Sequence, residues 1–507
     1  MELGASLQQA LERIVATGRI EVRENGTWLA CLDNFQYEIH PDNGDALLHL
    51  WSAQRNQFCR VIRILQEDPD RLVVEVQRFG RTRPVKLEFI AARKDPTTAR
   101  LTREQFRTRF RDFLCEQFPD ETVTSLSAAP DLEHSLSGSY VRGLTRSGSQ
   151  DWAVLAAAPD EGTAVCDGLL TFGLLWLDRA RHLASSGPVA GLRLFFPQGM
   201  GQATAHRVAA LAPDIAVKLY EYVPETGRAR EVDPLDAGNV QSWLVPRREA
   251  EDLLSAADPF LKPLLSRSPG AIQPHLVPGA NYVEVRYRGL AFARWQADGV
   301  FFGLGDNLKL LTPARQQAFD KLLNDFDTHR SPLASSTTHR LFRAQPERWL
   351  ESLIAADPSR VDAHLDTRFI YAQVPAVSIG DRGIMDLVGV TRDGMLTILE
   401  LKAQEDIHMP LQAVDYWLRV RWHHSREDFS RYGYFPGVTL DPRPPRLLLI
   451  APSLRFHPAT DVILRSLHPQ IEIERIGLSE SWRRGLKVVL RQGRERTPGG
   501  LTLPKKN

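Results

Sequence analysis

The chain has 507 residues, of which 43% are hydrophobic and 25% charged, as in a globular protein with enough apolar side chains for a core. Because 63 basic residues balance 62 acidic ones, the net charge of +1 excludes a polybasic nucleic-acid coat and an acidic tail protein, although it leaves room for a local basic groove. The apolar runs are shorter than the ~20 residues of a membrane span. The cysteines form no CxxC pair, so we expect a cytoplasmic protein without a disulfide framework or a zinc knuckle.

The first hundred residues favour one helix followed by strands. The first 20 residues read as an amphipathic helix, and residues 20–31 alternate like two half-buried strands that turn at Gly26. Further strands from Phe58 could form a small barrel that contacts nucleic acid, or an ordinary β domain with a basic outer face. The arginines interleaved in these strands are Arg60, Arg63, Arg78, Arg81 and Arg83.

Helices and strands alternate after Arg103, and their order then recurs. Residues 20–31, the helix from Arg103, and residues 143–158, 169–182 and 191–222 match a second series in the same order. The second series consists of residues 283–294, the helix from Arg343, and residues 389–403, 410–423 and 445–476.

This recurrence predicts an α/β protein with a tandem duplication of a small β unit plus an α/β domain that has a mixed central sheet. The alternative is that α/β segments resemble one another generically. The predicted division is a β-rich domain at 1–100, a first α/β domain at 101–235, a second β unit with a helical linker at 236–335, a second α/β domain at 336–490 and a basic flexible tail at 491–507.

Three residues of the second α/β domain carry chemistry. A predicted strand holds Asp386, a turn follows at Asp393-Gly394, and the next strand holds Glu400 and Lys402. Side chains at i and i+2 of a strand share a face, and a tight hairpin brings Asp386 beside them. Two carboxylates and an ammonium among apolar neighbours are costly unless compensated, and Mg²⁺ (or Mn²⁺) would compensate them. The alternative is a surface hairpin with a Glu–Lys pair.

An Asp, a hairpin and then Glu-x-Lys resembles the PD-(D/E)XK nuclease superfamily. Upstream, Glu351 stands where many members place a helix-borne Glu, and downstream Gln412 and Tyr416 match the QxxxY motif of RecB-type nuclease domains. The whole pattern is also similar to the NucS group of nucleases that act on branched and single-stranded DNA. The resemblance covers residues 343–480 and implies a restriction-endonuclease-like fold.

The resemblance implies metal-assisted phosphodiester hydrolysis. Asp386 and Glu400, with the Leu401 carbonyl, would hold one or two metal ions, and Glu351 would bind a second ion directly or through water. Lys402 would orient the attacking water or help to deprotonate it.

The predicted helix after the motif has a polar stripe. Gln412, Tyr416, Arg419 and His423 share one face, which would guide the phosphate backbone or would simply be solvated. The predicted core stripe of this helix is Leu411, Val414, Leu418 and Trp422.

The repeat places inert residues in the first α/β domain where the motif would lie. Tyr140 stands opposite Asp386, Ala156 opposite Glu400 and Ala158 opposite Lys402. We therefore expect only the second copy to keep an active site, with the first as a degenerate, nuclease-like scaffold or substrate-binding partner.

The leading prediction is a Mg²⁺-dependent nuclease for DNA, single-stranded or branched. The alternatives are a non-catalytic nucleic-acid-binding scaffold and an RNA-directed nuclease of the same fold. The chain is expected to act as a monomer with an internal pseudo-dimer or as a homodimer, with any helicase or repair or defence partner on a separate chain.

Overall fold

The computed structural model describes residues 2–15, 20–24, 27–32, 36–42, 45–51, 56–78, 84–91, 103–159, 161–183, 188–223, 228–233, 242–244, 250–277, 280–305, 307–378 and 381–493. The chain divides into two compact units, Met1–Ser242 with Val377–Gly383, and Trp243–Ala376 with Ile384–Asn507. The mixed α/β class is confirmed. Most of the predicted C-terminal tail lies outside the described residues, and so do Arg81 and Arg83 of the N-terminal strands.

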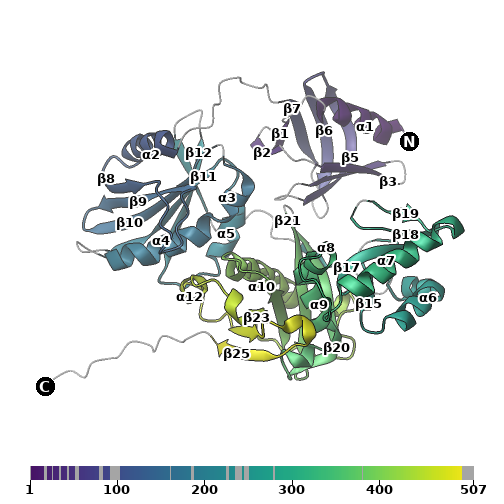
Figure 1. The fold of residues 1–507 in the computed structure, drawn as a ribbon. Helices are drawn as coiled ribbons and strands as arrows, with labels where there is room; N and C mark the ends of the chain where they lie inside the picture. Colours follow the sequence, from purple (N-terminus) through teal and green to yellow (C-terminus); the bar gives the residue numbers. More distant parts are fainter. Residues whose placement is uncertain are drawn as a thin grey trace. The chain divides into compact units, whose positions relative to one another are not determined.

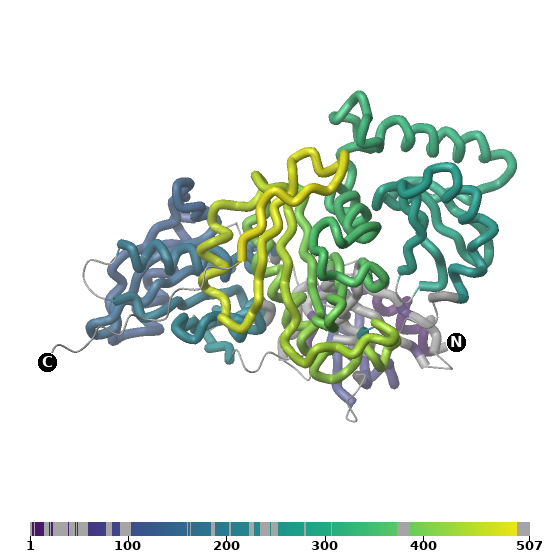
Figure 2. The backbone as a smooth tube through the Cα atoms, turned by 90° about the horizontal axis from the view of Figure 1, so that it is seen from below, coloured from purple at the N-terminus to yellow at the C-terminus, as the bar shows by residue number. Residues whose placement is uncertain are grey.

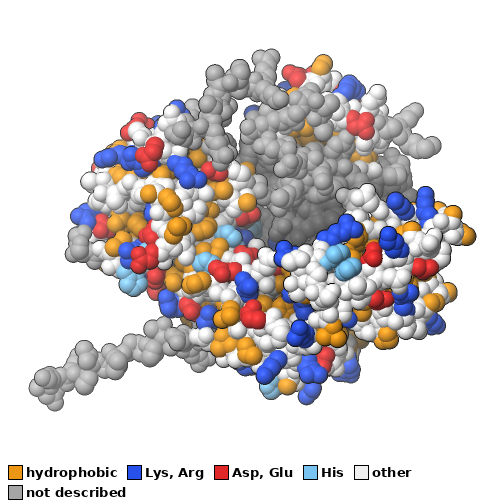
Figure 3. All heavy atoms as spheres, in the orientation of Figure 1, with side chains coloured by type: hydrophobic (Ala, Val, Ile, Leu, Met, Phe, Trp, Pro, Cys, Tyr) orange, Lys and Arg blue, Asp and Glu red, His pale blue; other side chains and the backbone are white. Residues whose placement is uncertain are grey.

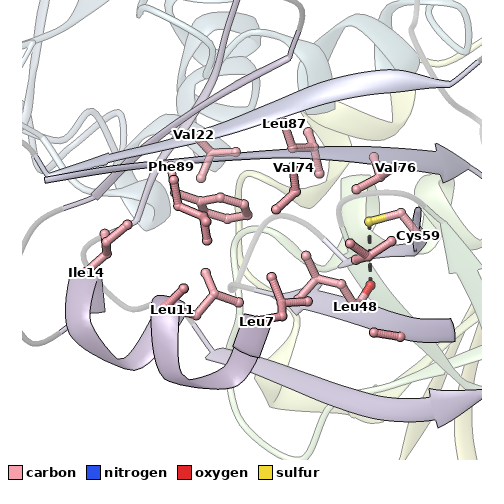
Figure 4. Packing of buried hydrophobic residues seen from close by; sticks show 14 of the residues in the cluster. Leu7, Leu11, Ile14, Val22, Leu48, Cys59, Val74, Val76, Leu87 and Phe89 are labelled. Carbon is pink, nitrogen blue, oxygen red and sulfur yellow. Dashed lines mark hydrogen bonds between the residues drawn. The ribbon is translucent and has the colours of Figure 1, made fainter. Parts of the chain in front are cut away.

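The chain begins with a helix on an antiparallel sheet. Helix α1 (Glu2–Val15) packs Leu7, Leu11 and Ile14, spaced by one helical turn, against Val74 and Phe89 of the sheet (Figure 4). The strands form a row in the order β2-β1-β7-β6-β5-β4-β3, with β2 and β3 at its ends. They are β1 (Ile20–Glu24), β2 (Thr27–Leu32), β3 (Gln36–Asp42), β4 (Asp45–Trp51), β5 (Asn56–Glu67), β6 (Arg71–Arg78) and β7 (Val85–Ala91).

The first α/β domain has a six-stranded sheet in the order β13-β12-β11-β10-β9-β8. Helix α2 (Arg103–Gln117) covers one face, and α4 (Leu169–Leu183) contacts β10 and β11 (Figure 1). The strands are β8 (Thr122–Ser127), β9 (Tyr140–Ser147), β10 (Gln150–Ala157), β11 (Val189–Pro197), β12 (Ala216–Val223) and β13 (Arg228–Val232), and the short helices are α3 (Thr163–Asp167) and α5 (Gln202–Val208).

The second β unit is a five-stranded antiparallel sheet whose apolar face packs on two helices. Val283, Phe292 and Phe302 of the sheet share a buried cluster with Phe319 and Phe326 of α7 (Gln316–His329). The other helix is α6 (Ala250–Arg267), and the strands are β15 (Ile272–Leu276), β16 (Val283–Tyr287), β17 (Leu290–Gln296), β18 (Gly299–Phe302) and β19 (Lys309–Leu310).

The second α/β domain is a seven-stranded sheet in the order β14-β20-β21-β22-β23-β24-β25, with its yellow C-terminal strands at one end (Figures 1 and 2). The strands are β14 (Ser242–Leu244), β20 (Leu365–Ser378), β21 (Asp381–Thr391), β22 (Leu396–Leu401), β23 (Arg446–Pro452), β24 (Ile473–Leu478) and β25 (Val488–Gly493). The helices are α8 (Arg340–Arg343), α9 (Pro346–Ala356), α10 (Met409–Ser425), α11 (Asp428–Arg431) and α12 (Thr460–Arg465).

A buried arginine joins the second β unit to the second α/β domain. Arg330, which is 0% exposed, donates through Nη2 to the Arg288 carbonyl (2.9 Å) in the β16–β17 turn. Its Nη1 donates to the carbonyls of Leu341 and Ala344 (both 2.7 Å), and its guanidinium lies 4.9 Å from the ring centroid of Trp349 in α9. One side chain therefore fixes the sheet, α8 and α9 together.

Five strands of the first α/β sheet, β9 to β13, have the same relative directions as five strands of the second, β21 to β25. β9–β10 and β21–β22 are antiparallel, the next two pairs in each sheet are parallel, and the last pair is antiparallel again. A helix precedes each series, α2 in one and α9 in the other, and longer helices, α4 and α10, follow the second antiparallel strand.

The strand register corrects the predicted counterparts of two motif residues. Tyr140 pairs with Ala157, and Ala156 and Ala158 belong to the cluster under α2. In the second α/β domain, Leu399 and Leu401 pack under α9. Glu400 lies between them in the strand, so its side chain is on the face of the sheet that points away from α9. The prediction for Ala156 and Ala158 was therefore wrong by one residue, which in a strand exchanges the two faces.

Candidate active site

The hairpin of β21 and β22 forms as predicted, with a turn that requires glycine. Gly394 has φ +90°, and a Cβ atom there would lie 2.2 Å from the carbonyl oxygen of Thr439. Thr391 closes the turn by accepting the Met395 N–H (2.9 Å) on its hydroxyl. The turn sets the antiparallel register, in which Leu387 pairs with Leu399.

Asp386 and Glu400 lie side by side in this register. Continuing the ladder by one residue from Leu387–Leu399 brings them opposite each other, and the Leu401 N–H donates to Asp386 Oδ2 (3.0 Å). Burial, followed by the nearby charge of Glu351, raises the pKa of Asp386 to about 6, against the opposing effect of the Leu401 N–H. Burial and the charge of Asp386 raise the pKa of Glu400 well above its ordinary value. The pair therefore resists double ionisation on its own.

One oxygen of this pair fits a cation. Glu400 is 1% exposed, and its Oε2 atom is buried without a hydrogen-bond partner among the described residues. A buried, unsatisfied carboxylate oxygen is costly, and a hard divalent cation would satisfy it while neutralising both carboxylates. The residues present thus suit Mg²⁺ or Mn²⁺ held by Asp386 and Glu400. Leu401 is buried at the end of β22, beside them.

The ligand set is smaller than predicted. Within the ranges that the structure describes, no group of three or more His, Cys, Asp or Glu side chains is close enough to hold a metal ion. Glu351 lies near enough for its charge to raise the pKa of Asp386, but it does not complete a metal-holding group with Asp386 and Glu400, and its role as a ligand stays a prediction. Its Oε2 instead accepts from Arg348 Nη1 at 2.5 Å, and its Oε1 lies 3.7 Å from Arg286 Nη1. Two guanidinium groups already neutralise this buried carboxylate, which removes the electrostatic need for a metal there.

Lys402 lies between two carboxylates. Its Nζ is 3.4 Å from Glu400 Oε1 and 3.3 Å from Asp406 Oδ2. Burial alone would lower the pKa of Lys402, but the charges of Glu400, Asp406 and Asp386 outweigh burial and raise it. The lysine is therefore an ammonium at neutral pH, which suits charge balance and the orientation of a water molecule rather than proton removal.

Sequence reasoning missed three groups that shape this site. Asp406 holds Lys402 from the loop that follows β22, and a carboxylate four residues after the lysine was the signal available in the sequence. Glu347, in the first turn of α9, accepts the N–H of Ala403 (3.3 Å) and ties that loop to the helix. The third, Arg286, comes from the second β unit, and no local sequence pattern predicts its contact with Glu351.

The predicted polar stripe of α10 is only partly a surface. Gln412, Tyr416 and Arg419 are half-buried, but His423 is 1% exposed and its Nδ1 lies 2.9 Å from Asp428 Oδ2. Helix α11 follows α10 at once and brings Asp428 over the last turn. His423 is therefore an internal hydrogen-bonding residue, and its predicted contact with nucleic acid is corrected.

The core stripe of α10 also differs from the prediction. Leu411 and Val414 are buried as expected, whereas Leu418 and Trp422 are partly exposed. Trp417 and Val420 are buried in their place, and Trp417 Nε1 donates to the Pro445 carbonyl (2.7 Å). The buried face of the helix is thus rotated by about one residue from the predicted one.

On the face that Figure 3 presents, basic and acidic side chains of the described residues are interspersed, in line with the net charge of +1. None of the described helices is both long and apolar enough to cross a membrane. A scan against protein-family models matches no family. A search of curated proteins finds no significant match either.

Proposed function

We propose that the chain is a Mg²⁺-dependent nuclease that hydrolyses phosphodiester bonds in DNA. The observation that carries the proposal is the pair of Asp386 and Glu400 on adjacent strands, in which Glu400 Oε2 is buried with no hydrogen-bond donor among the described residues. The resemblance to PD-(D/E)XK nucleases supplies the chemistry and favours single-stranded or branched DNA, acted on in the cytoplasm.

The roles follow from the contacts of each side chain. Asp386 and Glu400 would hold the metal ion, with the Leu401 carbonyl as a third oxygen. When bound, the ion would polarise the phosphate and lower the pKa of a bound water. Lys402, held by Asp406 at 3.3 Å, would orient the attacking water and offset negative charge on the phosphate.

The first α/β domain is proposed to be a degenerate copy with a restriction-endonuclease-like fold. The shared strand directions support a tandem duplication. Tyr140 and Ala157 occupy the paired positions that correspond to Asp386 and Glu400, and neither side chain is a metal ligand of the required kind. Its proposed role is to bind substrate or to act as a scaffold in an internal pseudo-dimer or a homodimer.

Cleavage of labelled single-stranded, branched and duplex DNA, and of the matching RNAs, tests the proposal in Mg²⁺ and Mn²⁺. We expect DNA products from the wild-type protein and none from the Asp386→Asn or Glu400→Gln variant. Asp393→Asn, in the turn of the same hairpin, is the matched control and should cleave normally. Cleavage of RNA alone would favour the RNA-directed alternative. Binding without cleavage by every protein would favour the non-catalytic scaffold, which the engagement of Glu351 by arginines also favours.

A further inference from the structure

The two oxygens of Glu351 face two different arginines. Oε2 accepts from Arg348 Nη1 at 2.5 Å, one turn earlier in α9, and Oε1 lies 3.7 Å from Arg286 Nη1. The Glu351 side chain is 5% exposed, so these contacts form away from water, where charge-assisted bonds are strong and well oriented. Glu351 is thus placed to hold cations rather than to receive a ligand from solvent.

The two arginines differ in what they leave available. Arg286 is 11% exposed, and its Nε donates to Glu284 Oε1 at 2.5 Å, so acids hold it on both sides. The turn after β16 also packs tightly on α9, because a Cβ atom on Gly289 would lie 1.9 Å from the Arg348 carbonyl oxygen. Arg286 is therefore a structural residue that links the second β unit to Glu351 in α9.

Arg348 is the outward member of the group. Its side chain is 29% exposed. A guanidinium has five N–H donors, and the contact with Glu351 Oε2 uses a donor on Nη1. Glu347, the residue before Arg348 in α9, accepts the N–H of Ala403 (3.3 Å), and Ala403 follows Lys402 directly, so this turn of α9 lies against the loop that carries the lysine. The charges of Arg348 and Lys402 both oppose the rise in the pKa of Asp386. Arg348 and Lys402, the latter 21% exposed, are thus two partly exposed cations beside the carboxylate pair.

We propose that Arg348 binds a non-bridging oxygen of the substrate phosphodiester next to the carboxylate pair, and that Glu351 is the residue that positions it. This inference rests on the proposed function and names a phosphate contact for the same site. A phosphodiester that approaches Asp386 and Glu400 would meet Arg348 from α9 and Lys402 from the loop after β22. A planar guanidinium suits two phosphate oxygens, and its orientation by Glu351 is set before substrate arrives.

The first test measures DNA binding by fluorescence anisotropy over a salt series, with Ca²⁺ present and the DNA checked for integrity. Arg348→Ala should weaken binding about tenfold and lower the salt slope by about one. The control is Arg360→Ala, which removes the arginine of another i, i+3 ion pair, the one with Asp357 just after α9. This variant should change neither the affinity for DNA nor the salt slope. An unchanged slope for Arg348→Ala would overturn the proposal.

The second test uses oligonucleotides that each carry one uncharged methylphosphonate. At one position the methylphosphonate should weaken binding of the wild-type protein, which loses the contact of Arg348 with that phosphate. The Arg348→Ala variant lacks this contact already, so the same methylphosphonate should not weaken its binding further. Equal weakening of both proteins at every position would overturn the contact. This test needs no change at Glu351, so it decides the question even if a Glu351 variant fails to fold.

The third test separates positioning from metal binding. In a calorimetric titration with Mn²⁺, Glu351→Gln should bind the ion within about twofold of wild type, while its DNA binding falls as in Arg348→Ala. Mn²⁺ binding weakened tenfold or more, with an unchanged DNA salt slope, would show Glu351 to be a metal ligand and overturn its positioning role. Failure of the wild type to cleave any substrate, with the Arg348 effects intact, would overturn the proposed hydrolysis alone.

Discussion

Replacing Asp386 by Asn should stabilise the metal-free protein at alkaline pH, although the residue is proposed to be essential for activity. The pKa of Asp386 rises from its ordinary 3.8 to about 6 in the folded chain. Between these values the folded state holds a proton that the unfolded state has released, so stability falls as the pH rises through this window and stays lower above it. A rise of this size lowers the free energy of unfolding of the metal-free protein by about 3 kcal/mol at pH 8.

Hydrogen exchange of peptides covering β21 and β22, with a chelator present, measures this local stability. At pH 8 the Asp386→Asn protein should exchange up to about a hundredfold more slowly than wild type, and the difference should shrink at pH 5. Asparagine can still accept the Leu401 N–H, so the hydrogen bond is kept while the charge is removed.

A control of opposite sign lies on the same hairpin. A hydrogen bond from Thr391 lowers the pKa of Asp393, so its charged form is favoured in the folded state and Asp393→Asn should not slow exchange. Adding Mg²⁺ should slow exchange in wild type and leave Asp386→Asn unchanged. Faster exchange of Asp386→Asn than of wild type at pH 8 would refute the electrostatic reasoning.

Three further changes test other parts of the structure. Lys402→Ala should abolish cleavage with an unchanged circular dichroism spectrum, and wild-type rates would remove this lysine from the mechanism. Gly394→Ala should lower the melting temperature of the second unit, because φ +90° and a backbone oxygen 2.2 Å from the new Cβ atom both oppose it; an unchanged melting curve would contradict the turn geometry. His423→Ala should cost roughly 1–3 kcal/mol of stability in denaturant unfolding and leave the DNA salt slope unaltered, whereas a lower slope would return His423 to the surface.

The hairpin of the candidate site could be predicted because its determinants are local. The alternation of side chains along a strand and the Asp393-Gly394 turn sufficed to bring Asp386 beside Glu400. The register across the two α/β domains was harder, since a slip of one residue at Ala156 exchanges the two faces of the sheet.

The parts that could not be predicted depend on tertiary contacts. Arg286 reaches Glu351 from another sheet, 65 residues earlier in the chain, and no spacing rule connects them. His423 has the sequence position of a surface residue, and it is buried only because α11 folds back and supplies Asp428. The pairing of Lys402 with Asp406 required a loop conformation that the sequence pattern does not determine.

The buried Arg330 has a practical consequence for dissecting the protein. A fragment that starts at residue 336, the predicted edge of the second α/β domain, would lack this guanidinium and leave the Leu341 and Ala344 carbonyls and the ring of Trp349 without it. Such a truncated chain would expose the face of α9 on which Glu351 and Arg348 stand. The smallest autonomous piece with the candidate site should therefore begin ahead of β14, near residue 242, so that it contains β14 and the five-stranded sheet together with strands β21 and β22.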